Sequence, residues 1–168
     1  MRLKDKVAVI TGAGSGIGRG MAQRFAEEGA DIVAADVNAK GAKETAALVR
    51  KAGRQAIAVT ADVSRRADVQ RMFAAAKERF GHYDILINNA GILTWGSILE
   101  LPEEDWDRVL AVNLKSMYLC CQETARYWVK EKIRGKIVNL GSFNSERAIP
   151  RIPHYCASKG GVKLFTAS

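Results

Sequence analysis

Near its amino terminus the chain reads Thr11-Gly12-Ala13-Gly14-Ser15-Gly16-Ile17-Gly18-Arg19. This glycine-rich turn follows the apolar run Val7–Thr11 and opens an amphipathic segment near Ile17–Glu28. Glycines let a backbone approach a pyrophosphate, and the amide groups at a helix N-terminus point at its charge. The Lys-Ser/Thr ending of an ATP-type phosphate loop is absent, because Gly20 follows Arg19. A flexible turn is the alternative, but the position directly after a first strand favours a dinucleotide site.

The rest of the chain alternates short apolar runs with longer amphipathic segments. Further strands are expected at Asp31–Asp36, Gln55–Thr60, Ile85–Asn88 and Lys136–Leu140, and further helices at 39–51, 65–80, 102–132 and from His154 onward. Near-continuous apolar runs are typical of parallel strands that are covered on both faces. Gly29, Gly53, Gly81 and Gly135 each follow a predicted helix, where a left-handed residue would end it. The pattern predicts a single α/β domain over residues 1–168, a doubly wound parallel (Rossmann) sheet with strand order 3-2-1-4-5.

The carboxyl-terminal part of the chain predicts contacts beyond this sheet. The segment Pro102–Lys132 carries an apolar stripe broader than one sheet face needs, which suits packing within the monomer or against a second subunit. The helix from His154 still carries apolar Val162, Leu164 and Phe165 near its end, which are expected in a core. Five strands are predicted where such sheets commonly have about six. We therefore expect the front part of a larger fold, truncated before its last strands, rather than a naturally short form.

Composition places the chain among ordinary globular proteins. Hydrophobic residues make up 48% and charged residues 26% of the chain. The net charge of +8 comes from scattered Lys and Arg without interleaved aromatics, so we expect an anionic cofactor or substrate and no nucleic acid. No apolar run reaches the roughly 18 residues of a membrane span. Cys120, Cys121 and Cys156 lack CxxC spacing and a His cluster, so we expect no metal site and a cytoplasmic location.

Asp36 ends the second predicted strand, 18 residues after Gly18. A carboxylate at this place can accept hydrogen bonds from the adenosine ribose hydroxyls of a dinucleotide. The same charge would repel a 2′-phosphate, and no Arg follows Asp36 directly. An ordinary loop Asp is the alternative interpretation. We predict that the cofactor is NAD rather than NADP.

The glycine turn resembles the cofactor signature of the short-chain dehydrogenase/reductase family, and further motifs follow in that family's order. They are Asp62-Val63, Asn88-Asn89-Ala90-Gly91, Asn113, Ser142 and Tyr155-Cys156-Ala157-Ser158-Lys159. The resemblance covers the chain from end to end. It implies that the cofactor lies against Gly12, Ser15, Gly16, Ile17, Gly18, Asp62, Val63, Asn89, Ala90 and Gly91, with the adenine near Asp62. It also implies a homo-oligomer that associates through helix 102–132 and the helix starting near residue 154.

Tyr155 and Lys159 are the candidates for proton transfer. They are four residues apart on a predicted helix and therefore share a face. An ammonium beside a phenol favours the phenolate, which suits acid–base work near neutral pH. The resemblance implies that Tyr155 exchanges the proton, Ser142 orients the substrate oxygen and Lys159 also binds the nicotinamide ribose. It further implies that Asn113 anchors a water in the proton relay, whereas His154 is expected to be an exposed loop residue.

These residues predict an oxidoreductase that moves a hydride between NAD(H) and a secondary alcohol or its ketone in a small molecule. Within the family, residues 141–145 and 154–162 are similar to sugar or polyol dehydrogenases and to 3-oxoacyl-carrier-protein reductases. A sugar or polyol fits the predicted NAD preference better, because the acyl reductases usually use NADP. The alternative of another class is a catalytically inert nucleotide-binding or scaffold fragment, and the 168-residue form itself is a candidate for weak turnover.

Overall fold

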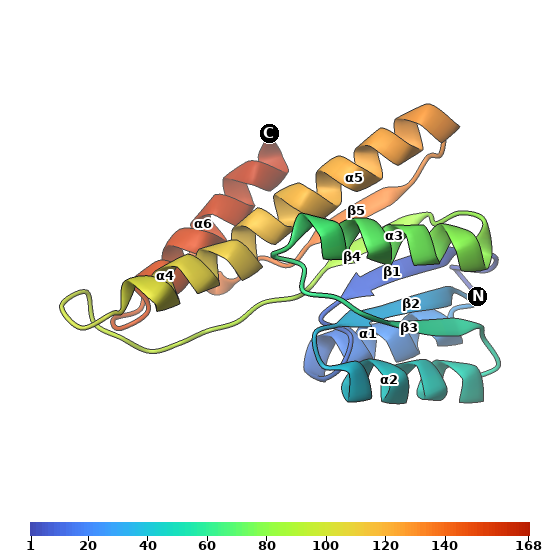
Figure 1. Ribbon diagram of the computed structural model, residues 1–168, viewed down its shortest axis with the longest axis horizontal. Coiled ribbons are helices and arrows are strands. Elements are labelled where there is room, and N and C mark those ends of the chain that lie inside the picture. Colours follow the sequence, from blue (N-terminus) through green and yellow to red (C-terminus); the bar gives the residue numbers. More distant parts are fainter.

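A five-stranded parallel sheet forms the centre of the protein (Figure 1). The computed structural model describes all of residues 1–168. The strands are β1 (Val7–Thr11), β2 (Asp31–Asp36), β3 (Ala56–Thr60), β4 (Ile85–Asn88) and β5 (Lys136–Asn139). They lie in the order β3-β2-β1-β4-β5, and all four pairs are parallel. The predicted fold class and strand order are confirmed.

The helices connect these strands and cover both faces of the sheet. They are α1 (Gly16–Glu27), α2 (Ala39–Lys51), α3 (Arg66–Phe80), α4 (Glu103–Leu110), α5 (Ser116–Glu131) and α6 (Pro153–Ala167). Figure 1 shows α1 and α2 on one side of the sheet and α3 on the other, while α4 and the adjoining end of α6 extend beyond it. No helix combines the length and the apolar character that crossing a membrane requires.

Alternate residues of β1 explain why the central strands are almost entirely apolar. Val7 and Val9 belong to a buried cluster that also holds side chains of α3 and α5. Ala8 and Ile10 point to the opposite face and belong to the cluster that holds side chains of α1 and α2. A strand with helices on both faces has no side left for polar residues. All residues of β1 and β4 are accordingly buried.

The predicted helix over 102–132 is interrupted, which corrects the sequence-based expectation. A wide π-helical turn at Ala111–Lys115 separates α4 from α5. Wide turns of this kind are rare and occur often at functional sites, and this one contains Asn113. At the end of α5, Lys132 takes the left-handed conformation (φ 57°) that was predicted for Gly135. Gly135 is instead required for space, because a Cβ there would collide with the indole of Trp128.

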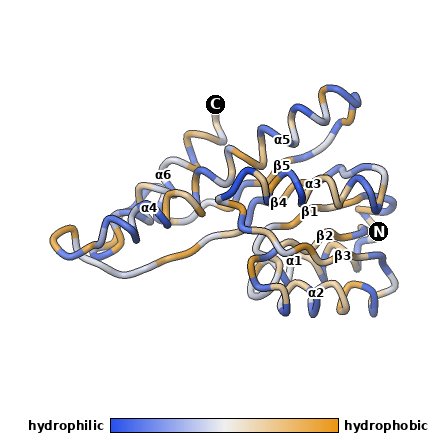
Figure 2. The backbone as a smooth tube through the Cα atoms, viewed as in Figure 1, coloured by the Kyte–Doolittle hydropathy of each residue, from blue (hydrophilic) through white to orange (hydrophobic).

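The carboxyl-terminal elements are less well covered than the central strands. The edge strand β5 pairs only with β4, and Val138 is 47% exposed. On α6, Val162 is buried as predicted, but Leu164 is 72% exposed, so its expected place in a core is wrong. The loop between β4 and α4 also carries hydrophobic stretches (Figure 2), and Trp95 is exposed there. Apolar side chains therefore remain exposed in this part of the described structure.

Candidate active site

A cavity of about 950 Å³ lies at the carboxyl ends of the central strands. Its walls come from the turn after β1, the end of β2, and the segments that follow β3 and β4. Ten predicted cofactor residues line it: Gly12, Ser15, Gly16, Ile17, Asp36, Asp62, Val63, Asn89, Ala90 and Gly91. Open α/β sheets bind ligands at this place, where the connections that follow two neighbouring strands lead to opposite faces of the sheet.

The glycine turn brings backbone close to backbone at the mouth of this cavity. Gly12 has φ +64°, and a Cβ on it would lie 2.8 Å from the Cα of Ala90. The N-cap residue of α1, Ser15, makes no side-chain capping bond, and the first turn of α1 holds no acidic residue. The first amide groups of a helix have no partner within the helix. The exposed start of α1 can therefore offer N–H donors to an anion.

Side-chain bonds fix the segment after β4 against the glycine turn. The backbone N–H groups of Asn89 and Ala90 both donate to Thr11 Oγ1, at 3.0 and 3.1 Å. The Asn89 amide donates to the carbonyls of Thr11 and Gly12, at 2.9 and 3.1 Å. These bonds close the cavity wall between β1 and β4.

The two carboxylates that the sequence predicts to contact the adenosine both line the larger cavity. Asp36 accepts the N–H of Gly14 on Oδ2 and the N–H of Asn38 on Oδ1, each at 2.8 Å. Asp62 accepts the N–H and the hydroxyl of Ser64 on Oδ1, at 3.0 and 2.6 Å. Each carboxylate oxygen has two lone pairs, so both groups keep acceptor capacity for ligand hydroxyls or amines.

A second cavity of about 240 Å³ contains the predicted catalytic pair. Tyr155 and Lys159 line it together with Asn89 and Gly91, which also line the larger cavity. Lys159 Nζ lies 5.8 Å from the centre of the Tyr155 ring and donates to the carbonyl oxygen of Leu140 at 2.7 Å. Burial lowers the pKa of the Lys159 ammonium. A phenol and an ammonium thus share one cavity that adjoins the larger one.

Asn113 is fully buried in the π-helical turn, and its side-chain amide makes three hydrogen bonds. Its Oδ1 accepts the N–H of Ile92 at 2.8 Å, and its Nδ2 donates to the Ile92 carbonyl at 3.0 Å and to Ser158 Oγ at 3.1 Å. It therefore ties the cavity segment at Ile92 to α6. The anchoring of a water by Asn113 stays a prediction.

Ser142 lies beside Gly141, which lines the smaller cavity. Its hydroxyl accepts the N–H of Asn144 at 3.1 Å and donates to Asn144 Oδ1 at 3.2 Å. It caps the short turn Phe143–Ser145 and makes no hydrogen bond to Tyr155. The substrate-orienting role of Ser142 stays a prediction.

Comparison with known proteins assigns the chain to a family. The family described as short chain dehydrogenase matches residues 6–168. The chain belongs to the short-chain dehydrogenase family. A relative from Escherichia coli (strain K12), 2-dehydro-3-deoxy-D-gluconate 5-dehydrogenase, is 39% identical over 98% of this chain and 64% of its own length. Sorbitol dehydrogenase of Cereibacter sphaeroides is 37% identical over 100% of this chain and 64% of its own length.

Solved structures of the family have the same fold. The structure of NAD+-bound xylitol dehydrogenase matches with a TM-score of 0.94 at 30% identity, over 99% of this chain and 64% of that one. Levodione reductase matches with a TM-score of 0.93 at 33% identity, over 98% and 65%. The chain thus spans about 64% of the length of the curated family members described above.

His154 differs most from its prediction. It is fully buried in the first turn of α6, not exposed in a loop. Its Nε2 lies 2.8 Å from Thr94 Oγ1, its Nδ1 has no partner, and burial lowers its pKa. Thr94 lines the larger cavity. The sequence could not show this burial, because it accompanies the packing of α6 against α4, two helices that are far apart in the chain.

Sequence reasoning also missed the roles of Thr11, Thr94 and Arg19. Thr11 ends a strand whose burial the pattern predicts, but its bonds reach Asn89, 78 residues away. Thr94 stands in a loop without a motif, and its partner is 60 residues distant. Arg19 bonds across to α2. No spacing within the sequence signals such contacts.

Proposed function

We propose that the protein binds NAD(H) across the two cavities and moves a hydride between the nicotinamide and a secondary alcohol or its ketone. The observation that carries this proposal is the convergence of Tyr155 and Lys159 in a cavity that shares Asn89 and Gly91 with the larger one. Membership of the short-chain dehydrogenase family supports it.

The residues of the larger cavity fit a dinucleotide. The uncapped start of α1 would hold the pyrophosphate, Asp36 the adenosine ribose, and Asp62 and Val63 the adenine. A Cβ at Gly12 would close the approach that the backbone leaves open. When bound, the nicotinamide supplies the hydride acceptor or donor, and the protein supplies geometry and the proton.

The residues of the smaller cavity would carry out the proton transfer. Tyr155 would give it to, or take it from, the substrate oxygen, which Ser142 would orient. The Lys159 ammonium, held beside the ring by the Leu140 carbonyl, would reach the nicotinamide ribose. Asn113 would anchor a water behind this pair. General acid–base help of this kind is worth about 10²- to 10⁴-fold in rate.

Asp36 supports NAD over NADP, because its carboxylate would repel a 2′-phosphate. The similar structure of xylitol dehydrogenase, which has NAD+ bound, supports this choice. Titration of protein fluorescence should give a dissociation constant for NADH at least about tenfold lower than for NADPH, the size of one unfavourable charge contact. In Asp36→Ser the two constants should approach each other. Equal affinities in the unaltered protein would overturn the assignment.

The substrate we propose is a sugar, a polyol or a similar small hydroxy compound. The names of the relatives, a deoxygluconate dehydrogenase and a sorbitol dehydrogenase, support this class. The test is NADH formation at 340 nm by the full-length protein with a panel of polyols and sugar acids, beside NADH consumption with 3-oxoacyl thioesters. Turnover of thioesters alone would favour a 3-oxoacyl-carrier-protein reductase. NADH binding without any turnover would favour a nucleotide-binding scaffold.

Self-association belongs to the same proposal. Val129 on α5 is 80% exposed, and Leu164 on α6 is exposed as well. Apolar side chains on these two helices support a homo-oligomer through them. Sedimentation of the full-length protein as a monomer would contradict it. The free state of all three cysteines supports a reducing compartment such as the cytoplasm.

A further inference from the structure

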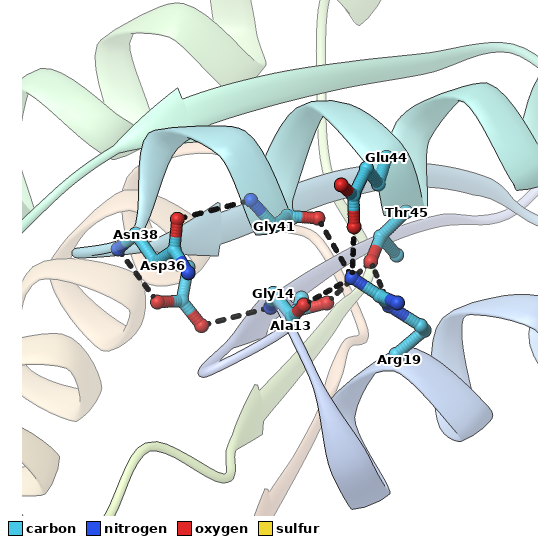
Figure 3. A network of polar contacts seen from close by, with 8 residues as sticks. All are labelled: Ala13, Gly14, Arg19, Asp36, Asn38, Gly41, Glu44 and Thr45. Carbon is cyan, nitrogen blue, oxygen red and sulfur yellow. Dashed lines mark hydrogen bonds and ion pairs between the residues drawn. The ribbon is translucent and has the colours of Figure 1, made fainter.

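Arg19 reaches from α1 to both the glycine turn and α2 (Figure 3). Its Nη2 donates to the carbonyl oxygen of Gly14 at 2.5 Å and to Glu44 Oε2 at 2.9 Å. Its Nε donates to Thr45 Oγ1 at 3.0 Å. The side chain is 30% exposed, so the contact covers it in part.

Thr45 extends the contact to the residue before Gly14. Its side chain is fully buried, and its hydroxyl, which accepts from Arg19, donates to the carbonyl oxygen of Ala13 at 2.7 Å. Consecutive carbonyls of the turn, those of Ala13 and Gly14, are therefore bound by Thr45 and Arg19. A planar guanidinium can serve two acceptors in fixed directions, which an ammonium cannot do.

The other side of Gly14 faces the adenosine end of the cavity. Its N–H donates to Asp36 Oδ2 at 2.8 Å, and a Cβ on Gly14 would lie 2.7 Å from Asp36 Cγ. A displacement of Gly14 would therefore displace the Asp36 carboxylate or break its bond. Figure 3 shows the Gly14 backbone between Asp36 on one side and Arg19 on the other.

We propose that Arg19 is a positioning residue for the dinucleotide site. Together with Thr45 it binds the carbonyl oxygens of the turn. The Gly14 N–H then keeps its hydrogen bond to Asp36, and the first N–H groups of α1 keep their orientation toward the cavity. A binding site held in its bound shape loses less freedom on binding and is tighter for that reason. The Glu44 carboxylate is 48% exposed, so its ion pair is the smaller part of the contact. The identity of the ligand, NAD(H), rests on the proposed function.

The test compares Arg19→Gln, Arg19→Lys and Arg24→Gln in the full-length protein. Arg24 is the matched control, because it lies on the same helix and bonds two carboxylates, Glu27 and Glu28, away from the turn. Two quantities are measured: the exchange rate of the Gly14 amide hydrogen without ligand, and the dissociation constant of NADH. The first reports the shape of the turn without any cofactor.

Arg19→Gln should raise the Gly14 exchange rate and the NADH dissociation constant by about tenfold each, the effect of one lost hydrogen bond to a charged group. Arg19→Lys should recover part of both changes, because its ammonium keeps the charge but lacks the rigid planar fork that bonds Gly14 and Thr45 at the same time. Arg24→Gln should leave both within about twofold, as expected for an exposed ion pair. In Glu44→Gln, both the exchange rate and the NADH dissociation constant should lie closer to the values of the control Arg24→Gln than to those of Arg19→Gln.

Two results would overturn the proposal. One is unchanged exchange of the Gly14 amide in Arg19→Gln, which together with weaker NADH affinity would mean that Arg19 acts only through its charge. The other is faster exchange with unchanged NADH affinity. Unaltered protein that binds no NADH would contradict the proposed function instead. The exchange measurement would still decide whether Arg19 holds the turn.

Discussion

The amino-terminal region, residues 1–88, and the carboxyl-terminal region, residues 89–168, are stabilised in different ways. In the first, the strands are buried between helices, and side-chain bonds of Thr11 and Arg19 hold the glycine turn. In the second, α5 also packs against the sheet, but β5 and the end of α6 are more exposed. Polar bonds within this region, of Asn113 with Ile92 and of Lys159 with Leu140, hold the segments near the predicted catalytic residues. The difference indicates that buried packing dominates around the strands of the first region, whereas polar contacts within the second region help to place the predicted catalytic residues.

The largest expected effect concerns the packing of the first region. Ile10→Ala should lower the free energy of unfolding by about 2–5 kcal/mol, because Ile10 is fully buried between β1 and its covering helices. Val37→Ala, the control, should change it by less than about 0.5 kcal/mol, since Val37 is 72% exposed. Urea unfolding measures both. Similar losses in the two variants would contradict the account that buried packing around β1 stabilises the first region.

A smaller effect is expected at the end of α5. Lys132 is held at φ 57°, a conformation that costs a side-chain-bearing residue about 1 kcal/mol relative to glycine. Lys132→Gly should therefore stabilise the protein by about 1 kcal/mol in thermal or urea unfolding. Lys130→Gly, inside the same helix, should destabilise it by about the same amount. Destabilisation by both would contradict the assignment of the helix end to Lys132.

The smallest effect is a dependence on pH that belongs to the second region. Burial lowers the pKa of His154 from its ordinary value of 6.5, so the unfolded chain takes up a proton that the folded chain resists. Stability should therefore fall as pH decreases below 6.5, down to the folded pKa of His154. His154→Gln should lose less stability over this range. Urea unfolding at a series of pH values from 7.5 downward measures the difference, and parallel curves would contradict it.

Sequence patterns predict the first region because its determinants are local. The run Val7–Thr11 is apolar because helices cover both of its faces, and the glycines after it permit the turn, so composition and order alone identify both. Tyr155 and Lys159 are also predicted as a pair, because a spacing of four residues places both on the same face of one helix, and both line the smaller cavity.

The remaining features depend on contacts that no spacing encodes. The π-helical turn depends on bonds from Asn113 to Ile92 and Ser158, and the burial of His154 depends on the packing of α6 against α4. Gly135 shows the same limit. A glycine after a helix can be needed for a left-handed backbone conformation or for the space that a Cβ would fill. Only the position of Trp128 decides between the two.

The proposed function assigns proton transfer to Tyr155, whereas most of the predicted cofactor residues belong to the first region. The most direct test is the turnover number of Tyr155→Phe in the full-length protein, with NAD+ and a polyol that the unaltered protein oxidises, measured beside the NADH dissociation constant. We expect the turnover number to fall by at least about 100-fold while the dissociation constant stays within about threefold. A near-normal turnover number would contradict the account.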